Sequence, residues 1–97
     1  DFRRILGRVV ETGAKTILVR DNFGQDTAIL WDIDGYLDVG FNHLKGYWNL
    51  WGRGEVEFYL KELGYKVTWI EDRRTKGQVE LVVGKPYTWG FMLAEKL

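Results

Sequence analysis

The sequence has 97 residues, with 14 basic and 14 acidic side chains, and 45% of its residues are hydrophobic. This length suits one domain, residues 1–97, with a single modest core. The net charge of zero argues against a protein that wraps duplex DNA by neutralising phosphates. No apolar run approaches the ~20 residues that cross a bilayer, so we expect no membrane partner and, by default, a cytoplasmic location. The first residue is Asp1 rather than Met, so a longer chain is one expectation.

The residue types that carry most catalytic chemistry are scarce. The sequence has no Cys, no Ser and a single histidine, His43. These absences exclude disulfides, Ser–His and Cys–His triads, and zinc sites built on Cys or on two imidazoles. We therefore expect no cofactor and no metal, and we assign His43 no role. Few Asn and Gln, no Cys and 29% charged residues are typical of a thermophilic source.

Helical spacing of five apolar residues predicts a first helix, which Gly13 ends: Phe2, Ile5, Leu6, Val9 and Val10. Two segments rich in β-branched and apolar residues, 15–21 and 26–33, predict antiparallel strands joined by a turn at 22–25. Asp34-Gly35 then favours a type I′ hairpin turn, which is followed by a third strand at 36–41.

Helical spacing returns at 56–63, and Gly64 follows the last helical residue. Strands are predicted at 65–71 and 78–84, joined by the polar turn 72–77. Pro86 is expected to block further pairing, and Thr88 to cap a closing helix through Leu97. Identities at an offset of 51 residues, such as Gly13 and Gly64, suggest two similar αββ units. The predicted fold is α+β, in the order α-βββ-(α)α-ββ-α, with helices packed on an antiparallel sheet of four to five strands.

The stretch 29–38 ends an apolar strand in Asp32-Ile33-Asp34-Gly35 and resembles the first motif of the haloacid dehalogenase-like phosphatases. That resemblance implies a nucleophile at Asp32 and a general acid at Asp34. Tyr36 stands where that family carries Thr, and the sequence lacks the βαβ alternation in which the motif operates. A hairpin turn with solvated carboxylates is the favoured interpretation.

Four acidic residues follow a helix–strand order that loosely resembles that of PD-(D/E)xK nucleases: Glu55, Glu57, Asp72 and Glu80. That resemblance implies a metal-dependent nuclease whose carboxylates hold Mg²⁺. The lysine of the motif is missing, because no Glu-x-Lys or Asp-x-Lys occurs in the sequence. Surface acids on a solvated helix, with Glu57 and Lys61 as an i,i+4 pair, are the favoured interpretation.

The segment 45–54 holds three aromatic rings and two cations: Tyr47, Trp48, Trp51, Lys45 and Arg53. The rings recur at helical spacing after Leu44, so one interpretation is a short helix whose aromatic stripe is buried. Three glycines in the same segment oppose a helix. The alternative is a loop at 42–54 that exposes the rings, and long loops of this kind tend to be functional.

Rings interleaved with cations on a chain without net charge favour binding of single strands, because stacking contributes ~1–3 kcal/mol per base. We therefore predict a non-enzymatic module that binds single-stranded DNA or RNA, with a sheet face as a further platform for Trp31 and Trp69. The predicted site comprises Tyr47, Trp48, Trp51, Lys45, Arg53, Trp69, Arg73, Arg74 and Lys76. The alternative is a protein-interaction or self-association module, such as a homo-oligomer, with an aromatic interface. A metal-dependent nuclease is the third candidate.

Overall fold

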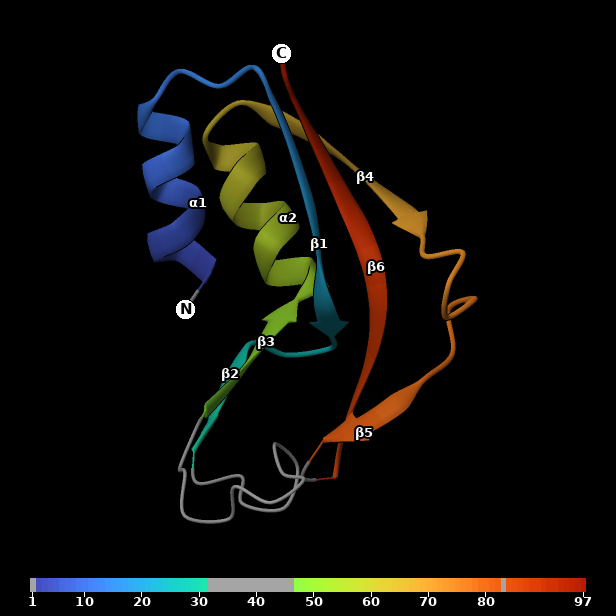
Figure 1. Ribbon diagram of the computed structural model, residues 1–97. Coiled ribbons are helices and arrows are strands. Elements are labelled where there is room, and N and C mark those ends of the chain that lie inside the picture. The colour runs from blue at the N-terminus through green and yellow to red at the C-terminus, as the bar shows by residue number, and fades with distance from the viewer. Residues whose placement is uncertain (1, 32–46, 83) are drawn as a thin grey trace.

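The computed structural model describes residues 2–31, 47–82 and 84–97. These residues form an α+β fold with two helices and a mostly antiparallel sheet of six strands (Figure 1). The elements in chain order are α1 (Phe2–Glu11), β1 (Thr16–Gly24), β2 (Ala28–Trp31), β3 (Tyr47–Gly52), α2 (Arg53–Glu62), β4 (Tyr65–Glu71), β5 (Glu80–Val82) and β6 (Lys85–Lys96). No helix in the described ranges is long and apolar enough to cross a membrane.

The strand β6 is an interior strand that pairs with three others, β1, β4 and β5. The strand order is β2-β3-β1-β6-β4, and the short β5 also pairs with β6. Both β1 and β4 run antiparallel to β6, whereas β1 and β3 are parallel, with Phe23 beside Trp51. The three strands β1, β6 and β4 therefore form a continuous surface of long neighbouring strands.

Both helices lie on the same side of this sheet (Figure 1). The core between them and the sheet takes residues from every layer: Phe2, Leu6, Ile17, Phe23, Trp51, Val56, Leu60, Tyr65, Met92 and Ala94. The helices approach each other closely at Gly7, where a Cβ atom would lie 3.0 Å from the hydroxyl oxygen of Tyr59. This packing covers one face of the sheet.

The two predicted helices at the start and middle of the chain are confirmed. Each ends before a glycine in the left-handed region, with φ of +79° at Gly13 and +88° at Gly64. The amide of Gly64 donates to the carbonyl oxygen of Lys61 over 3.0 Å, so a last-turn carbonyl keeps a partner. After each glycine the chain enters a strand that pairs with β6, so the two halves share an α–β unit.

The predicted closing helix at 88–97 is wrong, because these residues belong to β6. Met92 and Ala94 are buried under the helices, whereas Phe91 and Leu93 are half-buried on the other face. Apolar side chains on both faces erase the alternation that marks a strand in sequence. Pro86 does not end the pairing either, since it lies opposite Leu81 in the β5–β6 ladder.

Two of the three predicted hairpins are also wrong in their pairing. The strand β1 continues through the expected turn to Gly24, and its partners are β3 and β6 rather than β2. Likewise β4 and β5 both pair with β6, which is long enough to accept them one after the other. The αββ repeat therefore extends only to its α–β part.

The aromatic segment forms a strand instead of the expected short helix or loop where the structure describes it. Residues Tyr47–Gly52 form β3, and α2 begins at Arg53. The Asp34-Gly35 turn, the strand predicted at 36–41, His43 and the motif residue Asp32 lie outside the described residues.

Candidate functional site on the open face of the sheet

The pairing register assigns the side chains of β1, β6 and β4 to two faces. Met92 and Ala94 belong to the core under the helices, so the alternate residues of β6 point to the opposite side, which we call the open face. Directly paired residues of antiparallel strands share a face. The rows of the open face across β1, β6 and β4 are Thr16–Glu95–Lys66, Leu18–Leu93–Thr68, Arg20–Phe91–Ile70 and, on β1 and β6 alone, Asn22–Trp89.

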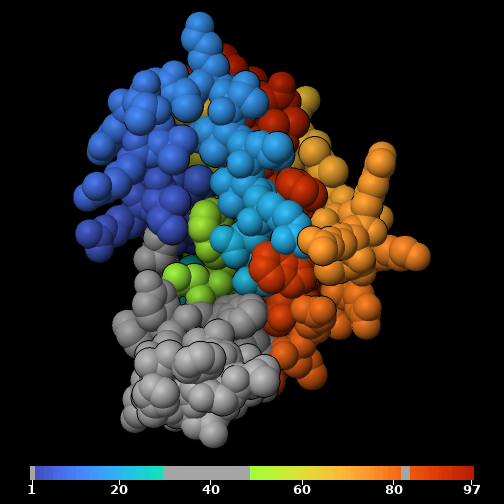
Figure 2. All heavy atoms as spheres, in the orientation of Figure 1, coloured from blue at the N-terminus to red at the C-terminus, as the bar shows by residue number. Residues whose placement is uncertain are grey.

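An apolar strip crosses the open face. Leu18 is 60% exposed and Ile70 is 44% exposed, while Trp89, Phe91 and Leu93 are half-buried. Figure 2 shows atoms of β1 (light blue) and β6 (red) at the surface beside the segment that follows β4 (orange), and no helix covers them in this view. Contiguous apolar surface of this kind is typical of a binding region.

Arg20 connects the strip to the segment after β4. Its guanidinium carbon lies 4.5 Å from the ring centroid of Trp89. Its Nη2 and Nε atoms donate to the two carboxylate oxygens of Asp72 over 3.0 and 3.3 Å. These hydrogen bonds outweigh the effect of burial and lower the pKa of Asp72 to about 2. Asp72 is 4% exposed, so an ionised, nearly buried carboxylate fastens this segment to β1.

The segment 72–77 is a compact turn that projects from the body of the molecule (Figure 2). The amide and hydroxyl of Thr75 donate to Oδ2 of Asp72 over 3.2 and 2.8 Å, and the amide of Lys76 donates to the carbonyl oxygen of Asp72 over 2.8 Å. This bonding leaves three exposed cations at the turn, which we call the cationic tip: Arg73, Arg74 and Lys76. The tip therefore sits beside the open face in a defined position.

Two of the predicted stacking residues face the helices instead. Trp51 is 3% exposed, and its ring centroid lies 5.9 Å from those of Phe2 and Phe23. Trp69 packs against the same core, with its centroid 4.9 Å from that of Phe23 and its Nε1 donating to Glu57 over 2.5 Å. Trp51 is thus a core residue, and neither ring belongs to the open face.

The structure brings one further predicted residue, Arg53, against Trp69. The guanidinium carbon of Arg53 lies 5.2 Å from the Trp69 ring centroid, and its Nη2 donates to Thr88 over 2.7 Å. They line a cavity of about 280 Å³ over Gly90, where the sheet has no side chain. This contact lies on the helix side of β6, because Thr88 and Gly90 alternate with the residues of the open face.

The remaining predicted residues are described only in part. Tyr47 and Trp48 lie in β3, where their backbones pair with those of Trp31 and Leu30. The side chains of all four lie outside the described residues, as does Lys45.

The predicted site does not include the aromatic residues of β6, because the sequence predicts a helix at 88–97. Tyr87, Trp89, Phe91 and Leu93 occupy alternate positions, which is the strand period. The apolar residues Met92 and Ala94 lie between them, so the sequence shows no polar–apolar alternation there, and the Arg20–Asp72 contact joins residues 52 positions apart and needs the fold.

The carboxylates that resemble a nuclease site serve separate structural contacts. Glu55 accepts the amide of Thr27 over 3.3 Å and lies 3.4 Å from Arg3, and the Thr27 hydrogen bond lowers the pKa of Glu55. Glu57 accepts from Trp69, and Asp72 binds Arg20. Within the described ranges, no three His, Cys, Asp or Glu residues could hold a metal ion together.

No protein family, curated protein or solved structure matches this chain. Its function must therefore be inferred from the open face and the cationic tip.

Proposed function

We propose that this protein is a non-enzymatic module that binds single-stranded nucleic acid on the open face of its sheet. The observation that carries the proposal is the pair Trp89 and Phe91 on the interior strand β6, next to the cationic tip. Sheets that bind single strands commonly stack bases on aromatic side chains of their central strands. The guanidinium of Arg20, which stacks on Trp89, offers a further planar group to a base.

The charges around the open face support contact with phosphates at one end. Arg20 is neutralised by Asp72, and Lys66 lies directly opposite Glu95 in the ladder. Among the described residues, no ion pair involves the three cations of the tip. They are therefore available to a phosphate backbone, and an otherwise uncharged platform suits single strands better than duplex DNA.

A labelled, unstructured oligonucleotide followed by fluorescence anisotropy over a range of salt concentrations tests this proposal. Substitution of all three tip cations by Gln should weaken binding to every single strand. It should also make the log–log salt dependence shallower, by up to ~0.7 per lost contact. Phe91→Ala should weaken binding by about 5- to 150-fold, since a stack is worth about 1–3 kcal/mol, and should leave the salt slope unchanged.

Phe58→Ala is the matched control, because Phe58 is an exposed ring, 67% accessible, on α2 and therefore on the other side of the sheet. Its affinity should equal that of the native protein. Absence of binding at low salt, or equal affinity in Phe91→Ala and the native protein, would contradict the proposal.

A protein-interaction module is the second candidate, and the aliphatic part of the strip favours it. Leu18 and Ile70 are exposed beside Trp89 and Arg20, and Trp and Arg dominate the energetics of protein interfaces. Association through this surface should respond little to salt, whereas nucleic-acid binding should weaken steeply.

A further inference from the structure

No strand in the described ranges pairs with the outer edge of β4. Among the described strands, β4 pairs only with β6. The amide of Leu97 donates to the carbonyl oxygen of Gly64 over 2.9 Å, which makes this pair a hydrogen-bonded one. Hydrogen-bonded and non-hydrogen-bonded pairs alternate along an antiparallel ladder. The next residue, Tyr65, and every second residue after it therefore direct their backbone N–H and C=O groups away from β6. The N–H and C=O groups of Tyr65, Val67, Trp69 and Glu71 therefore lie at the free edge.

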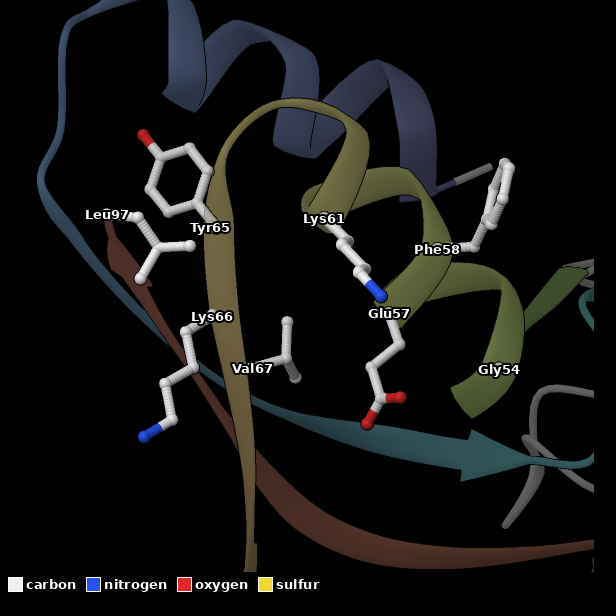
Figure 3. Close-up of a pocket in the computed structure, with 8 residues that line it drawn as sticks. All are labelled: Gly54, Glu57, Phe58, Lys61, Tyr65, Lys66, Val67 and Leu97. Atoms are coloured by element: carbon white, nitrogen blue, oxygen red, sulfur yellow. The ribbon is translucent and has the colours of Figure 1, made fainter.

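A groove of about 530 Å³ runs between this edge and α2. Figure 3 shows Glu57 and Lys61 reaching from α2 into the space beside β4, with Val67 pointing toward them. Lys61 and Leu97 lie toward the start of β4, near Tyr65. An added strand would therefore gain both backbone hydrogen bonds and an apolar side wall.

The charge along this edge changes sign from one end of β4 to the other. Lys61 and Lys66 lie near the start of the strand, whereas Glu57 contacts Trp69 near the end and Glu71 closes the strand. An antiparallel copy of the same strand would place its acidic end beside the basic end of the first. The edge is thus complementary in charge to itself.

We propose that two copies of this chain pair through β4, antiparallel about a two-fold axis, and join their sheets. In the register that pairs all of Tyr65–Glu71, Tyr65 lies opposite the partner's Glu71. Both are outward-bonding residues, as the ladder requires. Lys61 then faces the partner's Glu71. Because the axis is two-fold, Glu71 also faces the partner's Lys61, so the interface contains two such ion pairs.

This pairing also covers an edge that little else protects. Natural sheets blunt long edges with prolines, bulges or charged side chains; the seven residues of β4 include no proline, and its charges are Lys66 and Glu71. The inference goes beyond nucleic-acid binding, because it needs no ligand. Its consequence is that two open faces become one continuous platform across the axis.

The test is the molar mass in solution without nucleic acid, measured by sedimentation equilibrium over a range of protein concentrations. The native chain should be a dimer. Lys61→Glu or Glu71→Lys alone should raise the dimer dissociation constant at least about tenfold, since each creates two like-charge contacts. The double variant, with both changes, should recover most of the native association.

Glu62→Lys is the matched control, because Glu62 is exposed on α2 but lines the surface toward Arg3 rather than the groove. It should leave the mass unchanged, as should Phe91→Ala on the open face. A monomeric native chain, or a double variant that associates no better than the single ones, would overturn the proposal. Dissociation by Phe91→Ala would place the interface on the open face and would also overturn it.

Discussion

Substitution of Trp51 by Ala separates a core residue from a binding residue. The ring is 3% exposed and contacts the rings of Phe2 and Phe23, each with centroids 5.9 Å apart. Removal of a buried Trp costs about 3–5 kcal/mol, because it leaves a cavity as well as losing the transfer free energy. A domain of this size has a stability of about 5–15 kcal/mol, so the loss should be a large share of it.

Urea unfolding followed by far-UV circular dichroism measures this loss. With a slope of about 1–3 kcal/mol/M, the midpoint of Trp51→Ala should fall by at least about 1 M. Trp89→Ala is the comparison, because Trp89 is half-buried on the open face and stacks under Arg20. Its cost should be smaller than that of Trp51→Ala, since Trp89 stays half-exposed, although the ring also packs against Leu50 and Tyr87.

The two variants should also differ in binding. At a temperature where both are folded, Trp89→Ala should lose affinity for single strands and Trp51→Ala should keep it. A native-like midpoint for Trp51→Ala together with lost binding would refute the assignment of this ring to the core.

Two further predictions concern single contacts. The pKa of Asp72 is held at about 2, below the usual 3.8. The stabilisation that the ionised carboxylate contributes should therefore be fully present above about pH 4, and the free energy of unfolding should decrease as the pH falls toward about 2. Urea titrations should show this acid loss in the native chain and much less of it in Asp72→Asn; equal losses would contradict the role of Arg20. A Cβ atom at Gly52 would lie 2.7 Å from the amide nitrogen of Thr27, so Gly52→Ala should destabilise the fold by about 1–3 kcal/mol. At Gly54, the second residue of α2, an added Cβ atom would meet nothing within 4 Å. Gly54→Ala should therefore be neutral or stabilise the fold by up to about 1 kcal/mol in thermal unfolding, and equal effects of the two variants would argue against the close approach at Gly52.

The sequence by itself determined the two helices and their ends. Their signals are local: apolar residues at a spacing of three and four, and a glycine that can adopt a positive φ at the next turn. The strand β4 was predicted for the same reason, because Tyr65–Glu71 is bounded by turn residues and rich in β-branched and aromatic side chains. These interactions act between residues a few positions apart, so the order of the chain contains them.

Only the tertiary structure decided which strands pair and which rings are exposed. The apolar run Phe91–Met92–Leu93–Ala94 favours a helix when the sequence is considered alone. In the structure it pairs with β1 on one side and β4 on the other, so its residues face the core and the open face alternately. The aromatic residues divide in the same way: Trp51 enters the core because β3 pairs with β1 in the register that sets it beside the buried Phe23, and Trp89 remains half-exposed on β6. Burial depends on the neighbours that distant segments supply, and no local spacing encodes them.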